Sequence, residues 1–308
     1  MAVRVAVVAA APALAALGPL LDAYRAGGAV VDGVDPGAGG VPAPEALLET
    51  AGAADAVVLV VPRARSPRTV VPGPTLPGAG GGRVPVGVVA DVGPEGLSRF
   101  ATAAAAVHRR PHAAAAPSAS VAVLAQRDPR YLDLAERILR LLGESAPATP
   151  RFTWTGAELI RDDLVAGLGT GLGLAVYVGH GRPIGWVGYR GTRAHHLGDL
   201  DHPVGAVLSL ACSTASRRRT GLSFAEALPL QGSAAACLGA VGPTRHIDNA
   251  RWALRLVQGV AAGCRSVGEL VALAEPESTI GRAYRILGDP LAPLADEPGA
   301  AGAAERLS

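Results

Sequence analysis

The sequence predicts an α/β protein with a parallel sheet that is covered by helices on both faces. Short apolar runs alternate with segments of helical periodicity along almost the whole chain, a pattern typical of strands joined by crossover helices. The apolar runs are continuous rather than alternating, as expected for strands that are buried on both faces. Hydrophobic residues make up 49% of the 308 residues and charged residues 18%, which is enough apolar material for a large core.

The individual elements follow from the same pattern. The predicted strands are residues 3–9, 55–61, 85–90, 120–125, 172–178, 206–211 and 235–241. The segments between them place leucine and alanine at helical spacing, and the predicted helices are residues 13–26, 44–52, 94–108, 129–142, 156–166, 222–230, 248–262 and 266–274. We interpret the first strand and helix as part of the fold rather than as a signal peptide, because the first run is rich in β-branched valine.

Two stretches rich in proline, glycine or alanine interrupt the alternation. Residues 63–83 are predicted to form a long loop, and residues 109–119 a linker. The linker divides the chain into an N-terminal α/β subdomain, residues 1–110, and a larger α/β domain, residues 115–296. The Gly/Ala/Glu-rich residues 297–308 are expected to form a flexible tail.

The amino-acid composition indicates which partners the protein has and in which cellular compartment it lies. The net charge is +2, so we expect neither a nucleic-acid partner nor a membrane surface. An odd count of three cysteines in a chain of this size suits a reducing compartment, and we expect the protein to be cytoplasmic. The sequence contains no CxxC, and His195-His196 is not a usual zinc spacing, so no metal or other cofactor is expected.

Two short motifs, each at the end of an apolar run, are candidates for catalysis. His180-Gly181 follows one run and Ala211-Cys212 follows the next. Because the carboxyl ends of parallel strands meet at one edge of a sheet, we expect the imidazole and the thiol to lie close together. A thiolate is a nucleophile and an imidazole is a general acid or base. The pair therefore predicts a cysteine protease site, with Gly181 leaving space for a substrate carbonyl to approach the backbone.

These motifs and their flanks resemble the caspase/gingipain clan of cysteine peptidases. The similarity spans about residues 170–294 and rests on Gly179-His180-Gly181, Trp186, Leu197-Gly-Asp199-Leu200, Ser209-Leu-Ala-Cys212 and, as in the gingipain-like branch, Gly288-Asp289-Pro290. The resemblance implies a caspase-like fold preceded by a smaller α/β subdomain. It also implies a cysteine endopeptidase that cleaves a protein or peptide with a Cys-His dyad, and an oxyanion hole made by the backbone N–H groups of Gly181 and Cys212.

The resemblance extends to the substrate pocket and to the partner. In the clan, the strand after the cysteine strand and the loop beyond it form a wall of the primary pocket, which places Thr244, His246 and Asp248 there. Bacterial relatives often act in defence or regulated cell death, which implies a partner such as a bacterial gasdermin. The alternative is a catalytically idle caspase-fold scaffold that binds partners, and the presence of both His180 and Cys212 argues against it.

Several residues near the motifs leave alternatives open. A basic substrate residue requires a carboxylate, for which Asp248 and Asp91 are candidates, whereas an acidic one requires arginines such as Arg190, Arg193 or Arg245, and the sequence does not choose. The run Arg217-Arg218-Arg219 is interpreted as an exposed turn rather than as a self-processing point or an electrostatic guide.

Other residues are expected to have structural roles only. Cys237 and Cys264 are predicted to be inert packing residues. His195 and His196 are weak competitors for the base. Three acidic residues lie where a carboxylate could orient His180, but a solvated helix face is the favoured interpretation of all three: Glu158, Asp162 and Asp163. The Gly-rich residues 167–173 precede a strand rather than open a helix, so they are predicted to form a turn and not a phosphate loop.

Overall fold

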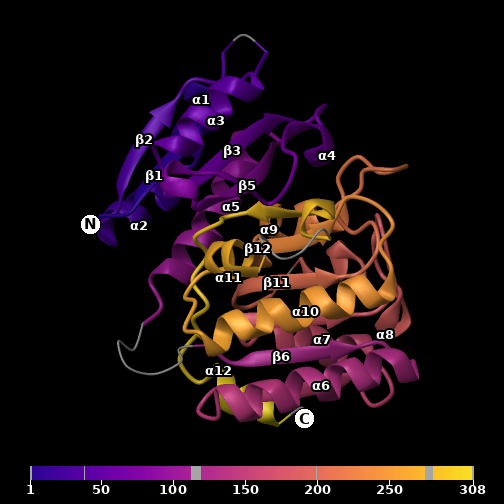
Figure 1. Cartoon of the computed structure of the whole chain (residues 1–308). Coiled ribbons are helices and arrows are strands. Elements are labelled where there is room, and N and C mark those ends of the chain that lie inside the picture. The colour runs from indigo at the N-terminus through magenta and orange to yellow at the C-terminus, as the bar shows by residue number, and fades with distance from the viewer. Residues whose placement is uncertain (1, 38, 112–118, 199, 275–279, 307–308) are drawn as a thin grey trace.

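A computed structural model describes residues 2–37, 39–111, 119–198, 200–274 and 280–306. One large sheet runs through the protein, in the strand order β2-β1-β3-β5-β13-β12-β11-β8-β6-β7, with β4 paired to β5. All neighbouring strands on this path are parallel except β12 and β13, which are antiparallel. Figure 1 shows the sheet running from β2 at the upper left to β6 near the bottom. The predicted α/β class is confirmed.

All seven predicted strands are present. They are β1 (Arg4–Val8), β3 (Ala56–Pro62), β5 (Arg83–Asp91), β6 (Val121–Ala125), β8 (Leu174–Val178), β11 (Val204–Leu210) and β12 (Ala234–Ala240). The structure adds strands that were not predicted: β2 (Val30–Val34), β4 (Thr75–Pro77), β7 (Arg151–Thr155), β13 (Tyr284–Gly288) and the short hairpin of β9 (Gly181–Arg182) and β10 (Gly185–Trp186). β2 and β7 are the two edges of the sheet, where polar residues replace the continuous apolar run.

The helices also agree closely with the prediction. They are α1 (Ala11–Ala16), α2 (Gly18–Ala26), α3 (Pro44–Gly52), α5 (Pro94–His108), α6 (Pro129–Ser145), α7 (Arg161–Leu168), α9 (Phe224–Leu230), α10 (His246–Ala261) and α11 (Val267–Ala274), to which α4 (Pro67–Val70), α8 (Gly188–Gly191) and α12 (Ala300–Glu305) are added. The loop predicted for residues 63–83 contains α4 and β4. The expected flexible tail contains α12, whose Ala300 and Ala304 are buried.

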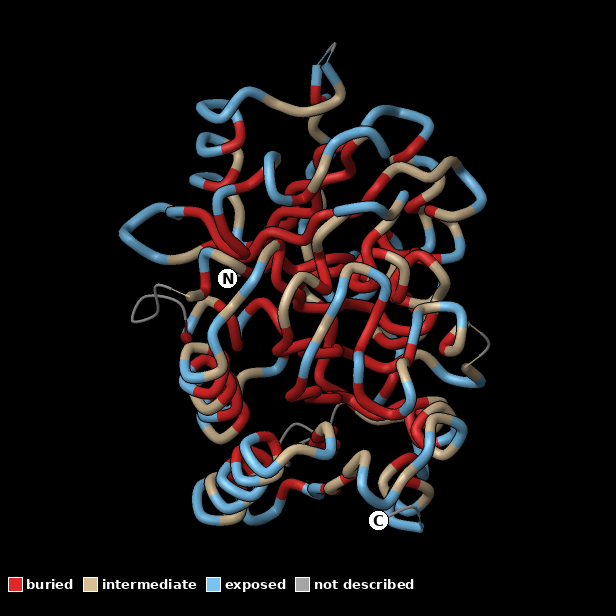
Figure 2. Tube along the Cα trace, turned by 90° about the vertical axis from the view of Figure 1, so that its right-hand side faces the viewer, coloured by how far each residue is buried: buried red, intermediate tan, exposed pale blue. Residues whose placement is uncertain are grey.

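The helices form two layers, one on each face of the sheet. Alternate residues of β1 show the division, since Val5 and Val7 belong to one hydrophobic cluster and Ala6 and Val8 to the other. The first cluster takes side chains from α2, α5, α6, α10 and α11, and the second from α3, α7, α9 and α12. Figure 2 shows the buried residues concentrated at the centre of the molecule, with the exposed ones around them.

Strand β13 joins the N-terminal and C-terminal halves into one sheet. It pairs with β12 on one side and with β5 on the other, where Ile286 lies opposite Gly87. A Cβ atom on Gly87 would lie 2.2 Å from the carbonyl oxygen of Gly288, so only glycine allows the two strands to meet here.

Directly after β13, the completely buried Asp289 contacts two helices of the N-terminal half. It accepts a hydrogen bond from Tyr24 Oη of α2 at 2.5 Å, and its other carboxylate oxygen lies 2.7 Å from His108 Nε2 of α5.

The expected boundary between two domains falls within this continuous architecture. Strands β1 to β5 form one half of the sheet, and β6 to β8 with β11 to β13 form the other. Most of the predicted linker, residues 112–118, lies outside the described residues. The division into residues 1–110 and 115–296 therefore stays a proposal. In the described part of the chain, no helix is both long enough and apolar enough to span a membrane.

The pairing of β8 with β11 sets the position of the candidate site. The two strands are parallel neighbours, and their register places Leu210 opposite Val178. His180 and Cys212 each follow two residues later, so they leave the sheet at the same level and at the same edge. The predicted adjacency of these two strands is confirmed.

Candidate active site

The backbones of the two motifs are in direct contact beyond the strand ends. A Cβ atom on Gly181 would lie 2.6 Å from the carbonyl oxygen of Cys212 and 2.8 Å from the Cβ of Ala211. Any other residue at position 181 would push the two loops apart. The structure thus brings His180-Gly181 and Ala211-Cys212 side by side, as the sequence analysis expected.

The sulfur of Cys212 is half-buried and lies against Thr244, which follows β12. Thr244 N donates to Cys212 Sγ at 3.4 Å, and the Thr244 carbonyl oxygen lies 3.3 Å from the same sulfur. Ser213, the next residue, has a φ of 60°, a left-handed conformation that is costly for a residue other than glycine. Its N–H donates to the carbonyl of Gly242 at 2.9 Å, which fixes the turn that leaves Cys212.

The other two cysteines lie in surroundings that disfavour a thiolate. Cys237 is completely buried in β12, and burial raises the pKa of its thiol well above the usual range. Cys264 follows α10, and both partial burial and the nearby charge of Glu269 raise the pKa of its thiol. Of the three cysteines, only Cys212 lies at the edge where parallel strands end, next to a histidine.

The main chain of His180 is held on both sides. Its N–H donates to Gln126 Oε1 at 2.8 Å, and its carbonyl accepts hydrogen bonds from Tyr177 Oη and from Val187 N, both at 3.0 Å. The imidazole itself is exposed and lies edge-to-face against the ring of Tyr131, with ring centroids 5.4 Å apart. Tyr131 Oη is 3.5 Å from His180 Nδ1, the upper limit for a hydrogen bond.

Tyr131 and Asp128 are site residues that the sequence analysis missed. Tyr131, in the first turn of α6, also contacts the ring of His246 at 5.1 Å. Asp128 caps α6, and the hydrogen bonds from Arg130, with the charge of His180 as a smaller cause, lower the pKa of Asp128 to about 2. The sequence held a signal for them, because Asp128-Pro129 begins a helix only two residues after β6, the strand next to β8.

The acidic residues considered upstream have other partners. Asp163 accepts a hydrogen bond from Ile160 N at 3.1 Å at the start of α7, and Glu158 accepts one from Thr155 Oγ1 at 3.0 Å. Asp162 is 80% exposed and lies 3.7 Å from Arg161. Asp162 and Asp163 lie in the first turn of α7, as predicted, whereas Glu158 lies in the turn before that helix.

A buried network links the two motif loops beneath the site. Trp186 Nε1 donates to Ser209 Oγ at 2.8 Å, and Ser209 Oγ donates to Thr214 Oγ1 at 3.1 Å. The Trp186 ring stacks on Tyr177 with centroids 4.3 Å apart. Two residues of the recognised motifs, Trp186 and Ser209, therefore connect the loop after β8 to Thr214 in the loop after β11. Asp199, which belonged to the same motif set, lies outside the described residues.

The predicted pocket residues divide into two groups. Thr244 touches the cysteine sulfur, and His246 contacts Tyr131, so both lie at the site. Asp248 is instead ion-paired with Arg245, with Arg245 Nε 2.7 Å from Asp248 Oδ2. Asp91 ends β5, and two strands, β13 and β12, separate that strand from β11. Neither carboxylate is therefore free and close to Cys212.

The arginine run after Cys212 differs from the predicted exposed turn. Arg218 and Arg219 are exposed, but the Arg217 side chain is only 11% exposed and pairs with Glu226, whose side chain is 1% exposed. A buried acidic partner on α9 draws Arg217 inward, which a charge count along the sequence could not reveal.

Within the described ranges, no group of three or more His, Cys, Asp or Glu residues could hold a metal ion.

The fold and the paired motifs define a cysteine peptidase of the caspase-like type, and comparison with known proteins agrees. The model of peptidase family C25 matches residues 116–295. No curated protein sequence matches the chain. Because the family match covers more than half of the sequence, the chain belongs to peptidase family C25, and it is a cysteine-type peptidase.

Solved structures share the fold at low sequence identity. The Arg-specific cysteine proteinase gingipain R (RgpB) superimposes with a TM-score of 0.74 at 15% identity, covering 95% of this chain and 78% of that one. The complex of the pro- and mature domains of RgpB from Porphyromonas gingivalis gives 0.70 at 15% identity, with 94% and 79% covered. The separase–securin complex of Saccharomyces cerevisiae gives 0.53 at 16% identity, with 76% and 16% covered.

The Tyr131 ring is expected to matter more than its hydroxyl. Tyr131→Phe keeps both edge-to-face contacts and loses only a long hydrogen bond, so kcat for peptide hydrolysis should fall less than about tenfold. Tyr131→Ala removes the contacts with His180 and His246 and should lower kcat further, at similar KM. Steady-state kinetics on one peptide checks both variants, and a Tyr131→Ala enzyme as fast as the wild type would show that the ring does not position the imidazole.

Proposed function

We propose that the protein is a cysteine endopeptidase in which Cys212 is the nucleophile and His180 the general acid and base. The Cys212 thiolate attacks the carbonyl carbon of the scissile peptide, and a carbon–sulfur bond forms. The backbone N–H groups of Gly181 and Cys212 donate hydrogen bonds to the developing oxyanion. His180 donates a proton to the leaving amine as the carbon–nitrogen bond breaks. It then takes a proton from the water that hydrolyses the thioester, which restores the thiolate.

The register of β8 and β11 is the observation that supports this proposal most strongly. In it, His180 and Cys212 follow the paired strands at one level of the sheet edge, and the missing side chain of Gly181 lets the two motifs approach closely. Because the Tyr131 ring lies edge-to-face against the imidazole of His180, we include Tyr131 as a group that orients the imidazole.

Hydrolysis of a peptide library by the purified chain tests the proposal. We expect cleavage within the peptides rather than release of terminal residues, and complete loss of cleavage after alkylation of thiols. Peptide mapping shows whether Cys212 has been alkylated. If the alkylated protein still cleaves the peptides, Cys212 is not the nucleophile.

The physiological substrate in this proposal is a protein, and the site is cytoplasmic. The clan resemblance implies a pore-forming protein of the bacterial gasdermin type as the partner, activated by cleavage. All three cysteines are free, which suits a reducing compartment. Incubating the purified peptidase with such a protein and sequencing the new termini would test this choice of substrate, since an uncleaved protein would eliminate it.

Thr244 and His246 are proposed to line the primary pocket, whereas Asp248 is proposed to hold Arg245. Asp248→Asn is therefore expected to leave the preference for the residue before the cleaved bond within about twofold of wild type, because the carboxylate is already neutralised. Thr244→Val changes a group in contact with the sulfur and should alter that preference more. Library profiling of both variants is the measurement, and a selective loss of cleavage after Arg or Lys in Asp248→Asn would restore Asp248 to the pocket.

A further inference from the structure

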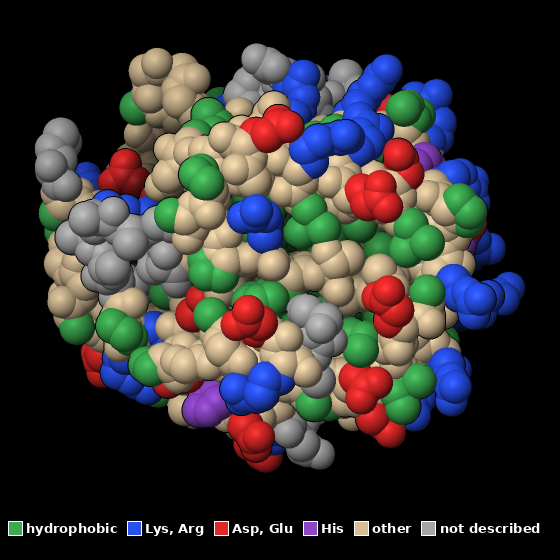
Figure 3. Space-filling model, turned by 90° about the horizontal axis from the view of Figure 1, so that it is seen from below, with side chains coloured by type: hydrophobic (Ala, Val, Ile, Leu, Met, Phe, Trp, Pro, Cys, Tyr) green, Lys and Arg blue, Asp and Glu red, His purple; other side chains and the backbone are tan. Residues whose placement is uncertain are grey.

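Six exposed arginines lie on the loops that follow β6, β8 and β11, the neighbouring strands at the candidate site. We call them the arginine rim, and they are Arg127, Arg182, Arg190, Arg193, Arg218 and Arg219. Among the residues that the structure describes, none of the six makes an ion pair. Figure 3 shows arginine side chains gathered along the right-hand edge of the molecule, the side on which α8 lies in Figure 1.

The arginine rim is built from three loops that follow neighbouring strands. Arg127 follows β6, which pairs with β8. Arg182 lies two residues beyond His180, and Arg190 and Arg193 follow in the same loop around α8. Arg218 and Arg219 lie in the loop that begins at Cys212. Positive charge therefore lies on the two loops that begin at His180 and Cys212 and on the loop of the next strand, β6.

Three carboxylates on the segments that follow β6, β7 and β12 already have arginine partners. They are Asp128 with Arg130 at 3.0 Å, Asp162 with Arg161 at 3.7 Å and Asp248 with Arg245 at 2.7 Å, and none of these arginines belongs to the arginine rim. The net charge of the whole chain is only +2, so the surplus of positive charge at this edge is local. A local surplus steers oppositely charged partners toward a site.

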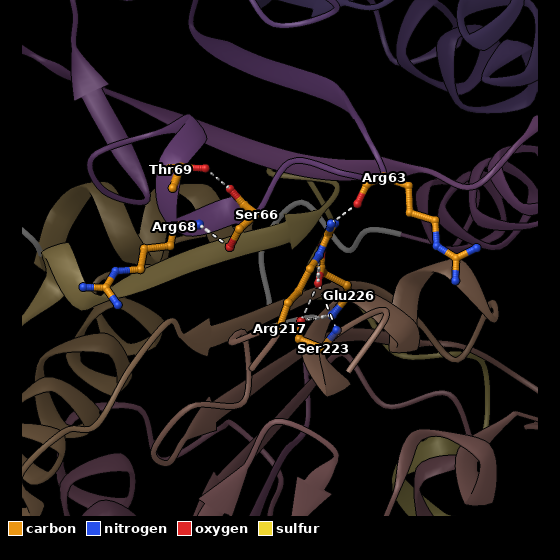
Figure 4. A network of polar contacts seen from close by, with 7 residues as sticks. All are labelled: Arg63, Ser66, Arg68, Thr69, Arg217, Ser223 and Glu226. Carbon is orange, nitrogen blue, oxygen red and sulfur yellow. Dashed lines mark hydrogen bonds and ion pairs between the residues drawn. The ribbon is translucent and has the colours of Figure 1, made fainter. Parts of the chain in front are cut away.

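The loop that carries Arg218 and Arg219 is held by the residue before them, Arg217. Arg217 Nε lies 2.9 Å from Glu226 Oε2, and Arg217 Nη1 donates to the carbonyl oxygen of Arg63 in the loop after β3. Figure 4 shows Arg217 directed at Glu226 and at the backbone of Arg63, while the Arg63 side chain extends away. The Arg63 guanidinium approaches Gly221, 3.3 Å from where a Cβ would lie. The loop that presents Arg218 and Arg219 is thus anchored at its base.

We infer that the substrate is a protein with an acidic segment beside the cleaved bond, and that this segment docks on the arginine rim. The inference rests on the proposed peptidase function and adds the substrate class to it. Guanidinium groups bind carboxylates in planar, two-point geometry, so an Asp- or Glu-rich segment is the protein partner that several unpaired arginines fit. The pairing of Asp248 with Arg245 removes the carboxylate that a basic segment would need.

Two fluorogenic peptides with the same cleaved bond test the inference. One has three Asp or Glu residues beside the bond, and the other has Asn or Gln in their place. At low ionic strength we expect kcat/KM of the wild type to be about tenfold higher for the acidic peptide, and this ratio should approach one in about 1 M salt, where charges are screened. A ratio near one at low salt would overturn the inference while leaving the peptidase function intact.

Arginine substitutions test whether the preference for the acidic peptide depends on the arginine rim. Arg218→Gln/Arg219→Gln is expected to reduce the acidic preference at low salt from about tenfold to about threefold or less. The matched control, Arg137→Gln/Arg140→Gln on the exposed face of α6, removes the same charge away from this edge and should keep the wild-type ratio. An equal loss of preference in both double variants would assign the effect to net charge and overturn the docking site.

Binding of the two peptides to the Cys212→Ala variant tests docking independently of catalysis. Fluorescence anisotropy should show tighter binding of the acidic peptide than of the neutral one, and weaker binding after the Arg218/Arg219 substitutions are added. If neither peptide is hydrolysed by the wild type but this binding order holds, the proposed chemistry fails and the acidic docking stands. If a short DNA duplex displaces the acidic peptide and binds more tightly, the edge is a nucleic-acid surface and the inference is wrong.

Discussion

Replacing Cys212 with alanine is expected to abolish peptide hydrolysis while leaving the fold intact. The thiol is half-buried at the end of β11 and contacts mainly Thr244, so its loss removes little packing. His180→Ala should lower kcat by at least about three orders of magnitude, and adding it to Cys212→Ala should cause no further loss, because such groups act as a unit. Steady-state kinetics and circular dichroism of the purified variants are the measurements.

The other two cysteines provide the matched controls. Cys237→Ala and Cys264→Ala are expected to keep turnover, since neither thiol lies at the site and burial raises the pKa of both. Cys237 is completely buried, so its removal should cost about 1 kcal/mol of unfolding free energy. Near-normal hydrolysis by Cys212→Ala, or its loss in either control, would show that the wrong nucleophile was chosen.

Breaking the ion pair beneath the cysteine loop is expected to be the most destabilising single change. Glu226→Ala leaves Arg217 buried without its partner, and it also removes the carboxylate that accepts hydrogen bonds from Ser223 N at 3.0 Å and Ser223 Oγ at 2.7 Å. The unfolding free energy should fall by about 3–5 kcal/mol, as for other buried pairs that lose one partner. Chemical denaturation monitored by circular dichroism measures this loss.

Two further variants identify the cause of that loss. Arg218→Ala removes a neighbouring exposed arginine and should change the unfolding free energy by less than about 0.5 kcal/mol. Arg217→Met/Glu226→Leu removes both charges and should be more stable than Glu226→Ala, since no uncompensated charge remains. A Glu226→Ala protein within about 1 kcal/mol of wild type would mean that water or another group already screens Arg217.

The interior of the fold could be predicted from the sequence, whereas its edges could not. Strands buried on both faces, such as β8 and β11, are continuous apolar runs that differ clearly from the amphipathic helices between them. The edge strand β2 contains Asp32 and Gly33 and is largely exposed, so its residues do not form such a run. β13 was missed because Arg285 interrupts it, although that side chain is buried and bonded to backbone carbonyls.

The residues of the candidate site that directly follow strands could be predicted from the sequence. The residues that reach the site through tertiary contacts could not. His180 and Cys212 follow paired strands directly, so parallel register alone brings them together. Tyr131 reaches His180 from a helix 49 residues earlier, and Arg217 is buried because Glu226 lies on a helix packed below it. The pairing of Asp248 with Arg245 also depends on side-chain conformation, which no spacing rule describes.

Covalent labelling with a peptidyl acyloxymethyl ketone, followed by intact-mass measurement and peptide mapping, tests the central claim most directly. Such a reagent alkylates only a thiolate that is aligned as it is for attack on a peptide carbonyl. The account predicts a single adduct on Cys212 of the native protein and a rate of labelling that falls by orders of magnitude in His180→Ala. An adduct on Cys237 or Cys264, or labelling of Cys212 that is equally fast without His180, would contradict it.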